Sequence, residues 1–380
     1  MQSRKIIFIG PAHPFRGGIA SSSEILASNL LLLGNDVEMM TYTTQYPQIL
    51  FPGKSQYTDS AAPANIKISR SYSSINPLSW RRARRQIIKE NPDLIVSRFW
   101  LPYLGVSAAH LLKPYPPAFN IKRLSIVDNL IPHQKMIGDN FCIKHYMNSH
   151  DQFIVMSSSV KEEIETRFKD KNILHIPHPV YDNYGDGVPR SEAIKKLNLD
   201  PSYKYLLFFG FIKPYKGLDL LLASLDKAYL EKHRIKLLIA GEVYGDDKPY
   251  YQKIKQGGLD THVVFHNKFI ADEMIKYYFS ATDLVVQTYL SATQSGISQI
   301  ALNFEKPVLV TNVGGLSEMV LDQRTGYVVE KNEGAIMSAI EDFFNHQRAN
   351  TFKTDIKQLK SENTWKAFTI KMMHFVFQES

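Results

Sequence analysis

The residues best placed to do chemistry lie between positions 291 and 315. This segment reads SATQSGISQIALNFEKPVLVTNVGG, in which a polar turn with one glycine leads into an apolar helix, and a paired-glycine turn follows the next short strand. Turns of this kind place backbone N–H groups and a helix N-terminus where a phosphate group can bind. The segment therefore predicts a site for a nucleotide sugar or a dinucleotide.

Two lysines form a second anion-binding element. In GFIKPYKGLD, residues 210–219, Lys213 and Lys216 follow a predicted strand and precede a predicted helix. Both ammonium groups could then reach a diphosphate held at that helix start, and charge developing on a departing diphosphate would strengthen the contacts. A solvated loop with two lysines is the alternative interpretation of this motif alone.

A third loop of this type follows the first predicted strand. Arg16, Gly17 and Gly18 precede a predicted helix whose first turn holds the serines 21–23. Glycine lets a ligand approach the backbone closely, and serines near a helix start are suited to capping it. Alone, the pattern also fits a tight turn between a strand and a helix.

Two sets of strands must position these loops. Short apolar runs alternate with amphipathic helical patterns, as expected of parallel sheets covered by helices. Residues 175–191, between the two sets, are rich in Pro, Gly and Asp, which is typical of a linker. We predict an α/β fold of two doubly wound domains, with ligands outside the carboxyl ends of the strands. The predicted strands are residues 5–10, 36–42, 93–99, 123–129 and 152–157, then 205–211, 236–242, 262–268, 283–289 and 307–312.

Composition limits the classes of function. The chain has 380 residues, enough for two or three domains, and a formal net charge of +8, which fits nucleic acid, an acidic membrane surface or a phosphorylated substrate. The single cysteine, Cys142, excludes an internal disulfide and a thiolate metal cluster built from this chain alone, and it favours a reducing compartment. Residues 1–20 hold only a short apolar run, so we expect neither a secretory signal nor a membrane span there.

Five motifs follow one another across most of the chain. They are GPAHPFRGGIASSSEILA (10–27), DNLIPHQK (128–135), GFIKPYKGLDLLL (210–222), LLIAGE (237–242) and the segment from 291 that ends in VGGLSEMV (313–320). None is specific alone, but in this order and spacing they resemble the family-four retaining glycosyltransferases, which have the GT-B fold. The resemblance is to members of bacterial cell-surface polysaccharide type.

The resemblance implies two Rossmann-like domains facing a cleft. Residues 1–185 would form the acceptor side, residues 186–362 would bind a nucleotide-diphosphate sugar, and a C-terminal helix in 363–380 would cross back onto the first domain. The sugar would pass to a glycan or lipid-linked acceptor with retention of configuration. No Asp-X-Asp motif ends a strand of the second set, and no His or Asp cluster has metal-ligand spacing, so we expect no metal and no cofactor.

The resemblance also implies roles for individual residues. Lys213 and Lys216 would be catalytic, and Asp128, where the family often has histidine, is a candidate acceptor base. His133, five residues on, is a catalytic candidate from its own chemistry, because a histidine can orient a sugar hydroxyl or move a proton near neutral pH; a purely structural role is the alternative. Arg16 and Asn129 would lie on the acceptor side. The donor would be bound by residues of the strand ends and two loops, namely Gly17, Gly18, Gly210, Glu242, Asn267, Lys268, Thr293, Gln294, Ser295, Gly296, Ile297 and Gln299.

The chain departs from the family pattern at two places. Phe211 stands where the family often has arginine, and Lys213 would then supply that charge. The family commonly has two glutamates with seven residues between them in the segment corresponding to 291–307, but residues 284–304 contain no Asp or Glu. Side chains such as Gln299 would replace them without charge assistance, unless Gln299 only decorates the helix surface.

We therefore predict a hexosyltransferase-like glycosyltransferase, with a nucleotide-sugar donor and a glycan or lipid-linked acceptor as partners. A nucleotide-sugar epimerase, or a non-catalytic nucleotide-sugar-binding or partner protein of the same fold, is the alternative. Nucleic acid is not expected, because no motif interleaves aromatic and basic residues. The stretch SWRRARRQIIKE, residues 79–90, fits a membrane-surface contact or a solvated helix face. We expect a cytoplasmic protein with a peripheral contact at the cytoplasmic face of the inner membrane.

Overall fold

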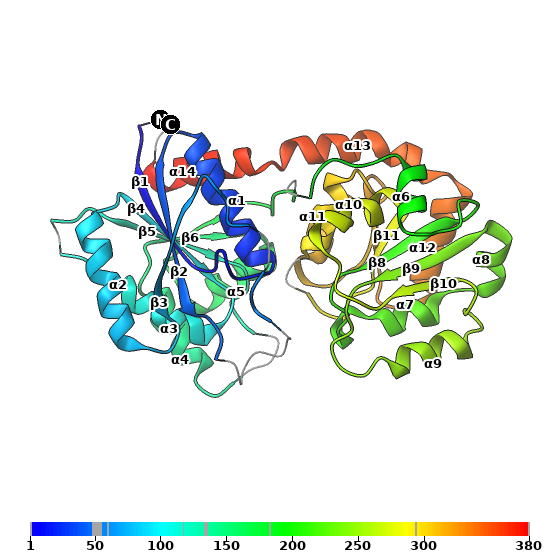
Figure 1. Ribbon diagram of the computed structural model, residues 1–380, viewed down its shortest axis with the longest axis horizontal. Helices are drawn as coiled ribbons and strands as arrows, with labels where there is room; N and C mark the ends of the chain where they lie inside the picture. Colours follow the sequence, from blue (N-terminus) through cyan, green and yellow to red (C-terminus); the bar gives the residue numbers. More distant parts are fainter. Residues whose placement is uncertain are drawn as a thin grey trace. The chain divides into compact units, whose positions relative to one another are not determined.

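The chain folds into two compact α/β units (Figure 1). The computed structural model describes residues 2–47, 55–58, 61–116, 118–132, 136–181, 184–292 and 295–378. Unit 1 contains Met1–Pro177 and Trp365–Ser380, and unit 2 contains His178–Thr364. The C-terminal segment therefore belongs to the unit in which the chain begins.

Unit 1 is built on a 7-stranded parallel sheet with the order β3-β2-β1-β4-β5-β6-β7. Helices cover both faces of such a sheet, so its central strands are continuous apolar runs such as KIIFI in β1. The strands are β1 (Lys5–Ile9), β2 (Asp36–Thr44), β3 (Lys67–Ser73), β4 (Leu94–Phe99), β5 (Lys122–Val127), β6 (Gln152–Val155) and β7 (Asn172–His175).

The helices of unit 1 form two layers. The chain moves in opposite directions along the sheet from β1 to β2 and from β3 to β4, so right-handed crossovers place α1 and α2 on opposite faces. On one face α14 packs against α1, and on the other α2, α3 and α4 form a row (Figure 1). The helices are α1 (Gly18–Leu32), α2 (Pro77–Glu90), α3 (Pro102–Leu111), α4 (Asp139–Met147), α5 (Ser158–Arg167) and α14 (Trp365–Phe377).

Two contacts fix α14 on unit 1. The side-chain amide of Gln152 donates to the Phe375 carbonyl oxygen at 3.1 Å. The Arg4 guanidinium lies 4.5 Å from the centroid of the Phe377 ring. The C-terminal helix therefore packs on the first unit, as the resemblance implies.

A polar network lies inside unit 1, between the sheet and α4. The Tyr146 hydroxyl is 2.5 Å from Ser97 Oγ and 2.8 Å from Ser125 Oγ. His150 Nε2 lies 2.7 Å from the same Ser97 hydroxyl. Burial lowers the pKa of His150 to about 3, so this imidazole is neutral in the folded protein.

Unit 2 has a 6-stranded parallel sheet with the order β10-β9-β8-β11-β12-β13. Its strands are β8 (Lys204–Phe209), β9 (Ile235–Ala240), β10 (Val263–His266), β11 (Leu284–Gln287), β12 (Val308–Thr311) and β13 (Gly326–Val329). Its helices are α6 (Arg190–Lys196), α7 (Leu218–Ser224), α8 (Lys227–His233), α9 (Lys248–Gln256), α10 (Asp272–Ala281), α11 (Gly296–Asn303), α12 (Glu333–Asn345) and α13 (Arg348–Glu362), with the 3-10 turns η2 (Pro214–Lys216) and η3 (Gly314–Met319).

The predicted fold class, two doubly wound parallel α/β domains, is confirmed. The sequence prediction omitted three strands, β3, β7 and β13, each of which lies at the edge of its sheet. None of the helices in the described ranges combines the length and the apolar character that a membrane span requires. Within those ranges, no three His, Cys, Asp or Glu side chains are grouped so that they could hold a metal ion.

Candidate functional site

Two glycine turns meet at the carboxyl edge of the unit 2 sheet. Gly210 follows β8 and Gly241 follows β9, and a Cβ added to Gly241 would lie 1.9 Å from the Gly210 carbonyl oxygen. The Gly210 amide donates to the Ala240 carbonyl oxygen at 2.9 Å. No side chain fits at Gly241, so the glycine that directly follows β9 allows the backbones of the two turns to lie in contact.

Lys216 is buried at this edge. It ends η2, is 9% exposed, and its ammonium lies 5.2 Å from the centroid of the Tyr289 ring. A Cβ added to Gly210 would lie 3.2 Å from Lys216 Nζ and 3.3 Å from Ile297 Cδ1, so these three residues come together. Among the described residues, no carboxylate pairs with this ammonium. A buried cation without a counter-charge is prepared to receive an anion.

Lys213 supplies a second cation beside the first. It is half-buried, and its ammonium lies 5.1 Å from the centroid of the Tyr244 ring. Burial lowers the pKa of Lys213, and the nearby charge of Lys216 lowers it further. An anion placed between the two ammonium groups would relieve this repulsion.

Gly217 fixes the turn that carries both lysines. Its φ is +66°, and a Cβ there would lie 2.0 Å from the Thr288 carbonyl oxygen. The Thr288 hydroxyl donates to the Gly217 carbonyl oxygen at 2.8 Å, and the Leu290 amide donates to the Tyr215 carbonyl oxygen at 2.7 Å. The lysine turn is therefore held against the chain that follows β11.

The start of α11 is held by a serine cap. Ser295 Oγ accepts from the Ile297 amide at 3.2 Å and donates to Gln287 Oε1 at 2.6 Å, and the Gln287 amide donates to Ser298 Oγ at 2.8 Å. Ser295 and Gly296 thus lie at a capped helix start, and the N–H of Ile297, a predicted donor-binding residue, is already bonded to the cap. Thr293 and Gln294 lie outside the described residues.

Gln299 is buried, so the alternative that it decorates the helix surface is wrong. Its side chain is 1% exposed, and neither its amide oxygen nor its amide nitrogen has a hydrogen-bond partner among the described residues. An unsatisfied buried amide is costly, and such groups are rare in folded proteins. Gln299 therefore holds unused hydrogen-bonding capacity in α11.

The remaining predicted donor residues have mixed roles. Asn267 is engaged in the fold, because its oxygen accepts from the Val243 amide at 3.0 Å and its nitrogen donates to Asp247 Oδ2 at 2.8 Å. Glu242 is half-buried after β9, and Lys268 is exposed after β10. The side chain of Asn267 thus shapes the loop that follows Glu242.

In unit 1, Asp128 is bound by a residue that the sequence prediction missed. Arg98 Nε donates to Asp128 Oδ2 at 2.9 Å, and Arg98 Nη2 donates to Asp128 Oδ1. Both side chains are buried, at the carboxyl ends of the neighbouring strands β4 and β5. The only sequence signal for this pair was a basic and an acidic residue at two adjacent strand ends. The Asp128 carboxylate is therefore occupied by a bidentate ion pair.

Asn129 follows this pair. Its Oδ1 atom is buried and has no hydrogen-bond partner among the described residues. His133 lies outside the described residues.

The loop at the start of α1 is open. Gly17 has a φ of +119° with no atom within 4 Å of an added Cβ, and the exposed Gly18 begins the helix. The Arg16 amide donates to the Gln56 carbonyl oxygen at 3.0 Å. The prediction that serines cap this helix is wrong, because the Ser22 and Ser23 hydroxyls donate to a carbonyl oxygen within the helix, that of residue 19, at 3.1 and 2.7 Å.

Residues 189–358 match the family described as Glycosyl transferases group 1. An uncharacterised glycosyltransferase of Methanocaldococcus jannaschii is 24% identical over 89% of this chain and 88% of its own length. A D-inositol 3-phosphate glycosyltransferase of Pseudarthrobacter chlorophenolicus is 25% identical over 84% of this chain and 80% of its own length.

Solved structures share the fold over both units. Sucrose-phosphate synthase from Thermosynechococcus elongatus superposes with a TM-score of 0.75 at 19% identity, covering 99% of each chain. Anabaena HepE in complex with UDP-glucose superposes with a TM-score of 0.71 at 16% identity, also covering 99% of each chain. These likenesses confirm the GT-B fold. The protein is a glycosyltransferase whose residues 189–358 match the group 1 glycosyl transferases.

Proposed function

We propose that the protein transfers a sugar from a nucleotide-diphosphate sugar to a glycan or lipid-linked acceptor, with retention of configuration and without a metal ion. The observation that carries the proposal is the ammonium of the buried residue Lys216, which has no carboxylate partner among the described residues and lies beside Lys213. Two adjacent ammonium groups can form charge-assisted hydrogen bonds with both phosphate groups of a diphosphate, which a single ammonium group cannot do as well.

The reaction would break the bond between the anomeric carbon and the diphosphate oxygen. Negative charge then grows on the departing nucleoside diphosphate, and Lys213 and Lys216 would stabilise it more strongly than in the bound donor. The acceptor hydroxyl would form the new bond on the face that the diphosphate leaves, and its proton would pass to the diphosphate oxygen. Retention rests on the family resemblance.

The donor contacts beyond the diphosphate would come from neutral groups. The Gln299 amide can both donate to and accept from hydroxyl groups, so it could bind the sugar or the ribose in place of a carboxylate. Two structures with this fold support a nucleotide donor: Anabaena HepE was solved with UDP-glucose, and the catalytic domain of Arabidopsis thaliana Starch Synthase IV with ADP and acarbose.

Asp128 has a different proposed role from the acceptor base first predicted. Its carboxylate is held by Arg98, so we assign the pair to positioning the chain after β5, where the buried Oδ1 atom of Asn129 has no hydrogen-bond partner in the part of the chain that the structure describes. A lipid-linked acceptor would place the reaction at the cytoplasmic face of a membrane.

A thermal-shift screen tests the proposal. Nucleoside diphosphates and their sugars are added to the whole protein, and a ligand at about 100 times its dissociation constant should stabilise the fold by about 2.7 kcal/mol. The binding nucleotide is then offered as its sugar conjugate to glycan and lipid acceptors, and product is measured by mass spectrometry. Release of an epimerised donor without acceptor would indicate an epimerase, and binding without any product would indicate a non-catalytic protein. Absence of binding by every nucleotide would refute the proposal.

A further inference from the structure

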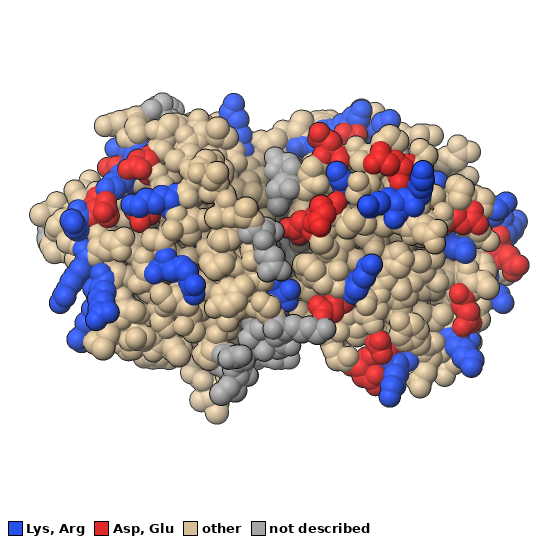
Figure 2. Space-filling view, in the orientation of Figure 1, with Lys and Arg blue, Asp and Glu red and all other residues tan. Residues whose placement is uncertain are grey.

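The outer face of α2 carries arginines that nothing in the described structure neutralises. Arg81, Arg82 and Arg85 are exposed, and none of them forms an ion pair or hydrogen bond with another described residue. Figure 2 shows Lys and Arg side chains gathered over this helix, at the left of the view. Arg81, Arg85 and Lys89 are spaced four residues apart, and like charges at this spacing destabilise a helix slightly. This repulsion slightly lowers the stability of α2, so the stability of the fold does not explain why these charges are present.

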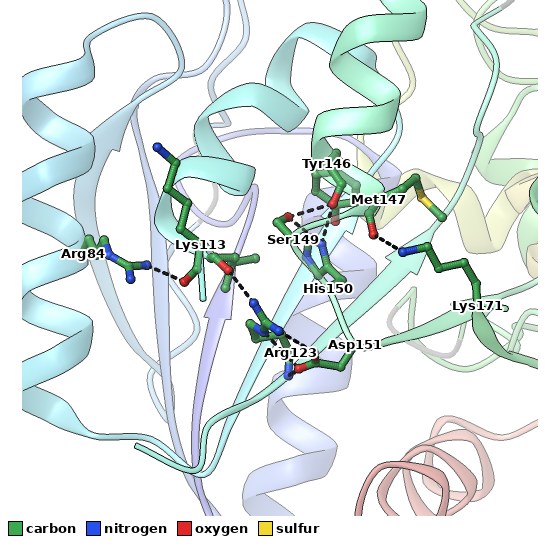
Figure 3. Close-up of polar contacts among 10 residues, drawn as sticks. Arg84, Lys113, Arg123, Tyr146, Met147, Ser149, His150, Asp151 and Lys171 are labelled. Carbon is green, nitrogen blue, oxygen red and sulfur yellow. Dashed lines mark hydrogen bonds and ion pairs between the residues drawn. The ribbon is translucent and has the colours of Figure 1, made fainter. Parts of the chain in front are cut away.

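Arg84 is different from its three neighbours. Its guanidinium donates to the carbonyl oxygens of Leu111, Lys113 and Pro114 at 2.8, 2.8 and 2.9 Å, and it lies 4.3 Å from the centroid of the Tyr115 ring. Figure 3 shows its contact with Lys113. Arg84 thus ties α2 to the end of α3, and only the other three arginines are available to a partner.

Large apolar side chains are exposed where two helices of the same layer begin. Ile75 and Leu78 are 58% and 63% exposed at the start of α2, and Met136, Ile137 and Phe141 are 69%, 108% and 71% exposed at the start of α4. Both helices follow parallel strands, β3 and β5, so both starts lie at the carboxyl edge of the sheet. The exposed apolar groups therefore lie on one side of the layer.

The charges of α2 and α4 belong to one continuous surface. His110 of α3 is close enough to Arg81 of α2 and to His145 of α4 that both lower its pKa, after the larger effects of burial, Lys113 and Arg84. The exposed Lys144 lies next to His145.

The acidic groups of the same three helices are already engaged. Glu90 accepts from Lys5 Nζ at 2.5 Å, and Asp139 accepts from the Met136 amide at 2.7 Å. Neither carboxylate therefore pairs with the exposed arginines, and this surface stays basic.

We propose that the outer face of α2, α3 and α4 docks on a membrane that contains anionic lipids. The exposed arginines contact lipid phosphates, and the apolar side chains at the two helix starts insert between the headgroups. Cations next to unpartnered apolar side chains fit an anionic bilayer surface, which offers both a negative potential and an apolar interior within reach of one helix. A nucleic acid would use the cations but leave the apolar side chains in water.

The experiment measures sedimentation of the whole protein with phosphatidylcholine vesicles that contain or lack phosphatidylglycerol. Each cation near such a surface contributes about a fivefold increase in binding, so Arg81→Gln, Arg82→Gln and Arg85→Gln together should weaken binding to the anionic vesicles roughly a hundredfold. The matched control replaces three exposed lysines of α9, Lys248, Lys253 and Lys255, with Gln; it removes the same charge and should leave binding nearly unchanged.

A second variant tests the apolar contact. Ile137→Ser with Phe141→Ser should lower binding about tenfold, and the loss should persist at high salt, where the arginine contribution is screened. Both side chains are exposed, so the unfolding temperature should not fall.

Three results would overturn the docking proposal: no binding to anionic vesicles, equal loss in the α9 control, or oligonucleotide binding that competes fully with vesicles and is unaffected by the apolar variant. The assay contains no donor or acceptor, so its failure would leave the proposed transfer reaction standing, and the reverse also holds.

Discussion

Replacing Lys216 by methionine should make the protein more stable and bind its donor less well. The Lys216 residue is buried, its ammonium lies over the Tyr289 ring, and no carboxylate among the described residues pairs with it, so the folded chain bears part of the cost of its lost hydration. Methionine has similar length, fills the same space beside Ile297, and packs well on an aromatic ring. The substitution removes the charge and leaves the packing.

The size of each effect follows from this environment. The contact with Tyr289 offsets part of the cost of burying the charge, because a cation over a ring gains about 0.5–2 kcal/mol. We therefore expect a net stabilisation of about 1 kcal/mol, which raises the unfolding temperature by about 2–4 °C in a domain of this size. A hydrogen bond to a charged group contributes about 1.5–3 kcal/mol, so affinity for a nucleoside diphosphate should fall roughly 10- to 150-fold.

Two measurements on the same variants test the reasoning. Differential scanning calorimetry without ligand gives the stability, and titration calorimetry with the nucleoside diphosphate found by screening gives the affinity. Lys232→Met removes an exposed lysine at the end of α8 and should change neither value. A Lys216→Met variant that melts lower than the native protein and binds nucleotide equally well would show that this ammonium is a structural element and would refute its role in diphosphate binding.

Three further substitutions test the fold around the site. The pKa of the buried His150 is lowered to about 3 in the folded protein (Figure 3), so the contribution of this neutral imidazole to stability is complete above pH 6.5 and is lost as the pH falls below that value. In urea unfolding, the free energy of unfolding of His150→Asn should therefore change less steeply with pH between pH 6 and pH 4, by up to about 1.4 kcal/mol per pH unit. Gly217→Ala would place its Cβ 2.0 Å from a backbone carbonyl oxygen and should lower the free energy of unfolding by more than about 2 kcal/mol. Gly258→Ala is the matched control, because Gly258 has a similar φ of +61° but its nearest contacts are to a lysine side chain at 3.5 Å. It should lower the free energy of unfolding by about 1 kcal/mol in the same urea experiment. Asp128→Asn removes the carboxylate that pairs with the buried Arg98 and should lower the free energy of unfolding by about 3 kcal/mol. Replacing both residues by apolar ones should restore the stability. An Asp128→Asn protein that is fully stable but inactive would instead make Asp128 the acceptor base.

The central strands could be predicted because burial on both faces leaves a signal in the sequence. In β1, β8 and β9 nearly every residue is buried, and each reads as a continuous apolar run. The three omitted strands lack that signal. β3 reads KISRSYS and is half exposed at its edge position, and β7 and β13 have 4 residues each, too few to show a period.

The sequence predicts only those parts of the site that follow from the order of strands, turns and helices along the chain. The pattern of strand, turn and helix places Lys213 and Lys216 at the carboxyl edge without any knowledge of tertiary contacts. The rings beneath their ammonium groups, Tyr244 and Tyr289, come from other strand ends, and only the fold brings them there. The ion pair of Arg98 with Asp128 is of the same kind.

Gln299 shows the limit of reasoning from helix patterns. A polar residue in a short amphipathic helix is usually solvent-facing, but residues 298–302 of α11 are all buried because the helix packs against α13 and η3 as well as the sheet. Burial on several sides removes the polar face that the sequence pattern leads one to expect.

The features that weaken unit 2 are the ones that fit a donor. Among the described residues, the buried amide of Gln299 has no hydrogen-bond partner and the ammonium of the buried residue Lys216 has no carboxylate partner; each destabilises the folded chain, and packing alone would favour apolar residues at both positions. Residues 284–304 contain no acidic residue, so no charge in that segment neutralises the lysine pair. A nucleotide-diphosphate sugar carries the matching groups, a dianionic diphosphate and several hydroxyls. On the proposed function, binding of such a ligand would offset the part of this cost that the contact with Tyr289 leaves, and the same substitution at Lys216 should therefore raise stability and lower affinity.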